Sequence, residues 1–119
     1  MINEIAKKVV EYNREHKYQE IYNEFYSPEI ISVESMDGPM KEVKGMEKIL
    51  EKMKWWEENN IVHSVEVSEP LIADSYFAVT FKMDVTDKNS GVRNASTELA
   101  VYHVKGGKIV REEFLYSME

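Results

Sequence analysis

The closing strand of the chain carries a carboxylate within an apolar row. Residues from Gly107 to Ser117 alternate with the two-residue period of a β-strand. One face of that strand then carries Val110, Glu112, Phe114 and Tyr116. A carboxylic acid among apolar side chains has a raised pKa, because desolvation disfavours its charged form. A group tuned in this way can act as a general acid or base near neutral pH. We therefore expect Glu112 to line a pocket.

Composition limits the classes of protein to consider. A chain of 119 residues, 43% hydrophobic and 31% charged, fits one soluble globular domain spanning residues 1–119. The net charge of −7 argues against a nucleic-acid binder and against an anionic membrane surface. The chain has no cysteine, which excludes disulfides and thiol catalysis and fits a cytoplasmic location. No unbroken apolar stretch suggests a signal peptide or a membrane span.

The periodicity of apolar residues predicts helices first and strands second. Helical spacing predicts three helices, over Asn3–His16, Lys17–Tyr26 and Gly45–Asn60. A period of two predicts strands over Glu29–Met36, Ile61–Ala73, Tyr76–Asp87, Arg93–Lys105 and Lys108–Ser117. Helices followed by an antiparallel meander are typical of an α+β fold.

Both faces of the predicted sheet are apolar. Leu99 and Val101 alternate with Ala100 and Tyr102 along one strand, so neither face is clearly polar. Three helices can cover only one face of such a sheet. We therefore expect a homodimer formed through the outer sheet face.

The order of these elements resembles the NTF2-like superfamily, which includes SnoaL-like domains and ketosteroid isomerases. The resemblance is carried by YNEFYSPEIISVES, KGMEKILEKM, SYFAVTFKMDV and AVYHVKGGKIVREEFLY. It implies an NTF2-like (cystatin-like) cone, in which three N-terminal helices pack on a curved, mainly antiparallel sheet around a pocket. The tyrosine and two aspartates of the isomerases correspond to Val9, Ser35 and Ala100 here. We therefore reject steroid isomerisation.

Strand parity within that fold implies which side chains face the pocket. The implied lining consists of Val33, Ser35, Trp56, Val65, Phe77, Val79, Phe81, Met83, Ala100, Tyr102, Phe114 and Tyr116. Three titratable side chains share these faces, and we take them as catalytic candidates: Glu98, Glu112 and His63.

The two glutamates lie on strands joined by the hairpin KGGK. We expect Ala100 to pair near Glu112, which would bring Glu98 close to it on one face. Two neighbouring carboxyl groups in an apolar cavity separate into an acid and a base, because one pKa rises further. His63 could pair with either glutamate or carry the proton itself.

Each candidate also has a structural interpretation. Glu112 could satisfy a tyrosine hydroxyl or a backbone N–H in the core, because buried charges are usually paired. His63 could be a solvated residue at the start of a strand, and Trp56 could be plain core. A metal site of His63, Glu98 and Glu112 lacks a closely spaced ligand pair, so we expect no metal and no cofactor.

These observations predict a SnoaL-like protein with an apolar pocket for a small hydrophobic molecule. Proton-transfer chemistry of an isomerase, cyclase or dehydratase kind would suit the glutamates. The alternative is a non-catalytic domain that binds a small ligand or serves as a dimerising protein-interaction domain. The sequence leaves open whether the protein is an enzyme.

Overall fold

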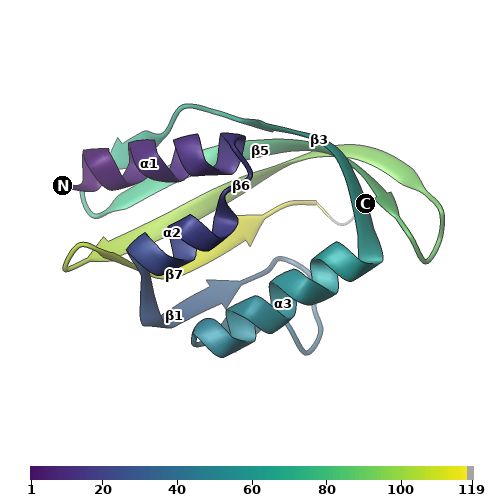
Figure 1. Ribbon diagram of the computed structural model, residues 1–119, viewed down its shortest axis with the longest axis horizontal. Coiled ribbons are helices and arrows are strands. Elements are labelled where there is room, and N and C mark those ends of the chain that lie inside the picture. The colour runs from purple at the N-terminus through teal and green to yellow at the C-terminus, as the bar shows by residue number, and fades with distance from the viewer. Residues whose placement is uncertain (118–119) are drawn as a thin grey trace.

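The computed structural model describes residues 1–117, which form three helices and seven strands (Figure 1). The helices are α1 (Ile2–Arg14), α2 (Tyr18–Phe25) and α3 (Met46–Asn59). The strands are β1 (Tyr26–Val33), β2 (Glu42–Lys44), β3 (Asn60–Val67), β4 (Leu71–Ala73), β5 (Tyr76–Asp87), β6 (Arg93–Lys105) and β7 (Lys108–Leu115). The predicted α+β class and the three helices are confirmed. The bounds of β5 and β6 agree with the prediction.

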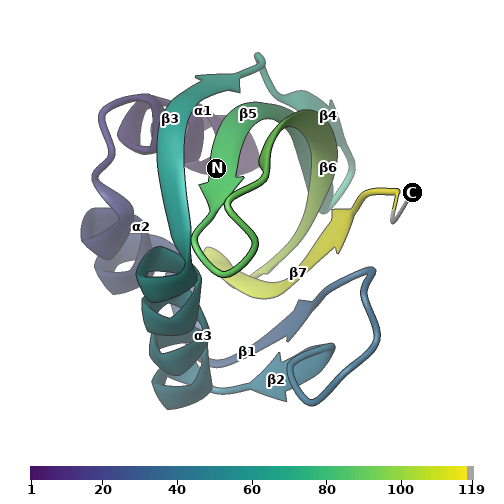
Figure 2. The ribbon, with the colours of Figure 1, turned by 90° about the vertical axis from the view of Figure 1, so that its right-hand side faces the viewer.

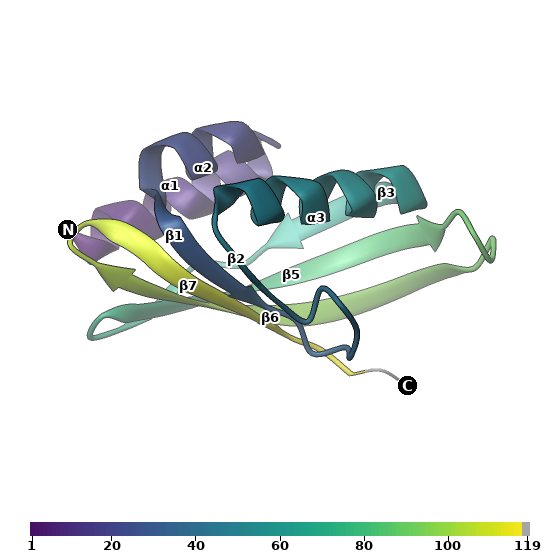
Figure 3. The ribbon, with the colours of Figure 1, turned by 90° about the horizontal axis from the view of Figure 1, so that it is seen from below.

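The strands form one curved sheet in the order β2-β1-β7-β6-β5-β3, and β4 pairs with β5. Only β1 and β7 pair in parallel, so the sheet is mainly antiparallel as expected. Figure 2 shows the sheet curling from β3 round to β1. All three helices lie on the concave side (Figure 3).

The core forms where α1 lies against the sheet. Apolar residues spaced three and four apart place one stripe of α1 on the concave face. The buried members of that stripe are Ile5, Ala6, Val9 and Val10. They belong to one cluster with the sheet residues Phe77, Val79, Ala100, Tyr102 and Ile109. The inner part of the predicted pocket is therefore occupied by packed side chains.

The predicted strand over Ile61–Ala73 is in fact two strands, β3 and β4, separated by Ser68–Pro70. Pro70 has no N–H to give to a ladder, so a strand is not expected to run through it. Ser68 ends β3 by bonding to Thr80 twice: its N–H donates to the Thr80 carbonyl, and its Oγ accepts from the Thr80 N–H.

The convex face of the sheet is apolar in part. Within residues 1–117, no helix covers it (Figure 3). Leu99 and Leu115 are opposite each other in the β6–β7 register and are 38% and 42% exposed. Tyr76 stacks on His103 on the same face, with ring centroids 4.3 Å apart. Among the same residues, no helix is long and apolar enough to cross a membrane.

Candidate functional site

Glu112 is a buried carboxylate with both oxygens occupied. It lies on β7 opposite Tyr102, and its side chain is only 4% exposed. The Tyr26 hydroxyl donates to Oε1, and the Ser32 hydroxyl donates to Oε2 at 2.6 Å. The sequence placed Glu112 on the inward face, and its burial among core residues agrees with that orientation.

The strict alternation expected for the closing strand is interrupted. The β6–β7 register passes from Val104 opposite Ile109 to His103 opposite Arg111, which leaves Val110 as an extra residue. This bulge brings the odd-numbered Ile109 into the core, where it is fully buried. Parity counted along the sequence could not show it, because a bulge depends on the partner strand.

The early strand β1 has the opposite parity to the one predicted. Ser32 faces inward, since it pairs with Glu112 in the register and bonds to its carboxylate. Val33 therefore lies on the other face of the strand, and the prediction that it lines the pocket is wrong. The register between β1 and β7 is irregular between Tyr26 and Ile31, so the pattern of β1 alone could not fix the face.

Ser35 lies just beyond the end of β1 and ties the chain to β7. Its hydroxyl donates to the Phe114 carbonyl at 2.9 Å and accepts from the Tyr116 N–H at 3.2 Å. These bonds to backbone give Ser35 a structural role in holding two strand ends together.

Two charged residues that sequence reasoning missed complete the cluster. Lys52 projects from α3, and its side chain is 13% exposed. The Lys52 Nζ lies 2.5 Å from Glu34 Oε2 and donates to Ser32 Oγ at 2.8 Å. The Tyr116 hydroxyl donates to Glu34 Oε1 at 2.8 Å. A network of hydrogen bonds therefore runs from Tyr116 at the end of β7 to Tyr26 in the core.

The sequence contained a signal for Lys52. It follows Ile49 by three residues and precedes Trp56 by four, so it shares the helix face that carries these apolar residues. A lysine at this spacing is easily interpreted as a solvated surface residue. A long aliphatic stem lets Lys52 pack in the cone while its ammonium reaches a carboxylate.

Glu98 differs from Glu112 in its hydrogen bonding. Glu98 lies on β6, opposite Phe81 of β5, and is partly buried. Among residues 1–117, no side-chain or backbone group bonds to its carboxylate. Burial raises the pKa of Glu98 to about 7, with a further rise from Glu34 and a smaller opposing effect of Lys52.

The expected pairing of Ala100 near Glu112 is not found, although Glu98 lies close enough for the charge of Glu112 to raise its pKa. Ala100 lies opposite Phe114, not near Glu112, whose partner is Tyr102. Glu98 is four residues from Tyr102 along β6, a backbone separation of about 13 Å. The two carboxyl groups instead share Lys52, which lowers the pKa of each.

Burial also dominates the pKa of Glu112 and raises it above its ordinary value. The bonds from Ser32 and Tyr26 and the charge of Lys52 act in the opposite direction. Burial likewise raises the pKa of Tyr26 far above its usual range. Tyr26 therefore stays protonated and serves as a donor to Glu112.

His63 does not join the glutamates. The β3–β5 register skips it, passing from Val62 opposite Val85 to Ser64 opposite Asp84. The His63 ring is exposed and its Nε2 lies 2.7 Å from the Thr86 hydroxyl. Thr86 alternates with Val85 and so faces the convex side. The predicted inward position of His63 is wrong, because a bulge in β3 turns it outward.

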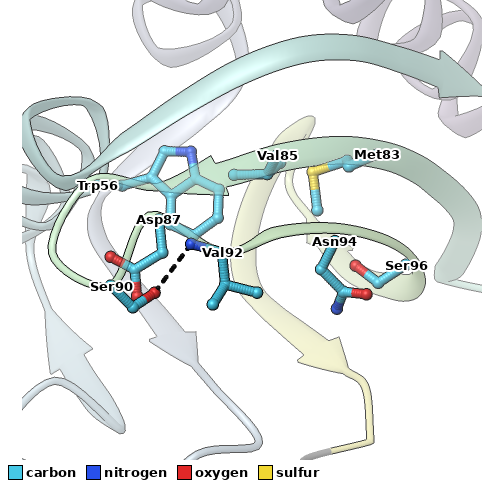
Figure 4. A pocket seen from close by; sticks show the side chains of 8 residues that line it. All are labelled: Trp56, Met83, Val85, Asp87, Ser90, Val92, Asn94 and Ser96. Atoms are coloured by element: carbon cyan, nitrogen blue, oxygen red, sulfur yellow. Dashed lines mark hydrogen bonds between the residues drawn. The ribbon is translucent and has the colours of Figure 1, made fainter.

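An open hollow of about 440 Å³ lies between α3 and the ends of β5 and β6 (Figure 4). Its lining comprises Trp56, Met83, Val85, Asp87, Ser90, Val92, Asn94 and Ser96. Two predicted pocket residues, Trp56 and Met83, are among them. Ser96 and Glu98 share a strand face, so Glu98 is the next inward-facing residue beyond the hollow.

The other predicted lining residues lie deeper. Phe77, Val79, Phe81, Ala100 and Tyr102 are core residues, and Val65 and Phe114 pack against that core. Within residues 1–117, no three His, Asp or Glu side chains are arranged to hold a metal ion.

The family of this chain follows from comparison with known proteins. A family model described as a SnoaL-like domain matches residues 1–116. The chain is 38% identical to a crystal structure from Mesorhizobium loti, provisionally assigned as a SnoaL-like polyketide cyclase [carbohydrate phosphatase]. That match covers 98% of this chain and 99% of the other, with a TM-score of 0.94. The protein belongs to the SnoaL-like domain family.

Two more distant structures confirm the fold. An NTF2-like protein of unknown function from Burkholderia pseudomallei is 13% identical, covers 98% and 92% of the two chains, and has a TM-score of 0.78. A protein with a cystatin-like fold from Xanthomonas campestris is 15% identical, covers 98% and 89%, and has a TM-score of 0.76. No curated protein matches the chain. The predicted NTF2-like (cystatin-like) fold is therefore confirmed.

Proposed function

We propose that this protein binds a small, mainly apolar molecule in the hollow beneath α3 and exchanges a proton with it through Glu98. The single observation that carries the proposal is the state of Glu98, a partly buried carboxyl group that receives no hydrogen bond from any group within residues 1–117. Burial raises its pKa to about 7, so protonated and ionised forms are both populated at neutral pH. A general acid or base works best under that condition.

Glu112 has a supporting role in this proposal. Its two oxygens accept bonds from Tyr26 and Ser32, and its side chain is almost fully buried. A ligand could reach it only by displacing these donors. Glu112 therefore holds β1 and β7 together beneath the site, and Glu98 is the carboxyl group that meets the ligand.

The hollow suits a small ligand in size and lining. Its volume of about 440 Å³ falls within the range of small-molecule sites, roughly 300–1,000 Å³. Trp56, Met83 and Val85 make an apolar wall, and Asp87, Asn94 and Ser96 add polar groups at intervals. The provisional assignment of the Mesorhizobium loti relative as a SnoaL-like polyketide cyclase is consistent with a small-molecule site of this kind.

The test uses 2-tetralone as a probe ketone in D₂O. The Glu98 carboxylate takes an α-proton to give the enolate, and the exchanged carboxyl group returns a deuteron to the same carbon. We expect the wild-type protein to accelerate exchange at least about tenfold over Glu98→Gln, since positioned acid–base catalysis contributes this much or more. Glu66→Gln, which removes an exposed carboxylate on β3, is the matched control. Equal exchange by wild type and Glu98→Gln would remove the catalytic role.

Adding 2-tetralone stepwise to the labelled protein separates catalysis from simple binding. Shifts of the Ser96 amide and the Trp56 indole N–H in ¹⁵N spectra report ligand in the hollow. Binding without exchange would favour the alternative, a domain that holds a ligand without turning it over.

A second function rests on the exposed apolar side chains of the convex face. Leu99, Leu115 and Tyr76 lie on a sheet surface that the helices leave bare. We propose that two copies of the chain pair through this surface, which would bury these side chains and leave both hollows open. Such a dimer would also suit a protein-interaction domain.

A further inference from the structure

Three carboxylates and one ammonium group share the inner end of the site. Glu34, Glu98 and Glu112 come from three different segments, and Lys52 is the cation that acts on them. Like charges in a partly buried space repel, so the position of the single cation among these carboxylates affects their electrostatics.

Lys52 makes different contacts with the three carboxylates. It pairs directly with Glu34, with 2.5 Å between Nζ and Oε2. It reaches Glu112 through Ser32, because Ser32 accepts from Lys52 and donates to Glu112. Glu98 receives neither a direct nor a relayed bond from Lys52 within residues 1–117. Charge-assisted hydrogen bonds are stronger than neutral ones, so the contacts with Glu34 and Ser32 fix the position of the ammonium group.

The ammonium is held in place from several sides. Its Nζ lies 5.3 Å from the centroid of the Phe114 ring, within the range of a cation–π contact. Ser32 and Glu34 fix its direction, and the stem of Lys52 leaves only 13% of the side chain exposed. A lysine held in this way is a fixed charge and not a mobile surface group.

We propose that Lys52 is a positioning residue of this site. It fixes a positive charge between Glu34 and Ser32, and so leaves Glu98 as the carboxyl group of the three that is free to meet the ligand. This inference rests on the proposed function, since it concerns the carboxyl group that meets the ligand.

The other groups around Glu98 agree with this division. The titratable and charged side chains that act on or face Glu98 are Lys52 from α3, Glu34 after β1, Tyr102 on β6, Glu112 on β7 and Tyr116 after β7. Burial keeps the pKa of both tyrosines above the usual value, so they remain neutral. Lys52 is the cation of the set.

The helix also links this charge to the hollow. Lys52 and Trp56 are four residues apart on α3 and therefore lie on the same face, one turn from each other. Trp56 forms part of the wall of the hollow in Figure 4. A ligand that packs on Trp56 therefore contacts the same helix that carries the Lys52 ammonium group.

The test follows the titration of the Glu98 carboxyl carbon in the whole chain by ¹³C NMR of labelled glutamate. In wild type, we expect Glu98 to titrate near pH 7. In Lys52→Met the cation that favours the charged form of Glu98 is lost, so we expect its midpoint, and with it the pH profile of probe exchange, to move upward. Lys52→Arg keeps the charge and should restore the wild-type midpoint.

The double variant Lys52→Met/Glu34→Gln removes the ion pair as a neutral unit and keeps the test informative if Lys52→Met folds poorly. We expect the Glu98 midpoint to return toward its wild-type value, because Glu34 raises the pKa of Glu98 and Lys52 lowers it. An unchanged Glu98 midpoint in Lys52→Met, or a midpoint in the double variant as high as in Lys52→Met, would overturn the proposed role of Lys52. These outcomes are independent of 2-tetralone exchange by wild type, so a failure of the proposed function is distinguishable from a failure of this inference.

Discussion

Replacing Glu98 by glutamine should stabilise the protein by an amount that grows as the pH rises from about 4.5 to about 7 and then levels off. Burial raises the pKa of Glu98 from 4.5 to about 7 in the folded state. Between these two values the folded protein binds more protons than the unfolded chain, so the free energy of unfolding falls as the pH rises. Each pKa unit corresponds to about 1.4 kcal/mol, so the loss approaches about 3 kcal/mol by pH 8. Glutamine has the same shape and does not titrate.

The assay is urea unfolding followed by tryptophan fluorescence at pH 4.5, 6, 7 and 8. The difference in unfolding free energy between Glu98→Gln and wild type should be near zero at pH 4.5 and rise to about 3 kcal/mol at pH 8. Glu112 and the other groups titrate in both proteins, so their contributions largely cancel in the difference. Glu66→Gln, an exposed change of the same kind, should show no such rise. A difference that stays constant across the pH range would refute the reasoning.

Three further predictions concern the network and the convex face. Tyr26→Phe removes a donor to buried Glu112 and should cost about 2 kcal/mol in urea unfolding, whereas Tyr12→Phe breaks a tyrosine–glutamate bond at the surface and should cost much less. Lys52→Met leaves partly buried carboxylates without their cation and should cost about 3 kcal/mol, most of which Glu34→Gln in the same chain should restore; a cost unchanged by the second substitution would contradict the pairing. Leu99→Asp places a charge on the convex face, so light scattering should show monomers of 13.9 kDa where wild type shows twice that mass; equal masses would exclude this dimer.

Sequence periodicity predicted the fold well for helices and strands whose buried faces do not depend on the register with a partner. The strands β5 and β6 alternate over 12 and 13 residues, which is long enough to define both their bounds and their buried faces. The stripe of α1 repeats at helical spacing and is buried as expected. The family resemblance supplied the arrangement of these elements, which periodicity alone does not contain.

Periodicity failed where the position of a side chain depends on a partner strand. His63 lies at a bulge against β5, and Val33 lies in a strand whose register with β7 is irregular. A bulge adds one residue to one strand and reverses the parity beyond it, so the sequence of a single strand cannot reveal it. The same cause displaced Glu98 from Glu112 relative to the expected pairing.

The missed charges were hidden by their chemical type. Lys52 and Glu34 are residues that usually lie in solvent, and only the three-dimensional contact between α3 and the end of β1 shows them as a partly buried pair. Glu112 was singled out correctly as a buried carboxylate, but its structural alternative, a bond to a tyrosine hydroxyl, is the one that the Tyr26 contact favours.

The protonation of Glu98 is tested most directly by the titration of its carboxyl carbon in the wild-type protein, assigned by comparison with Glu98→Gln. We expect a midpoint near pH 7, because burial disfavours the charge and no donor within residues 1–117 compensates. A midpoint near 4.5, the ordinary value for a solvated glutamate, would contradict it.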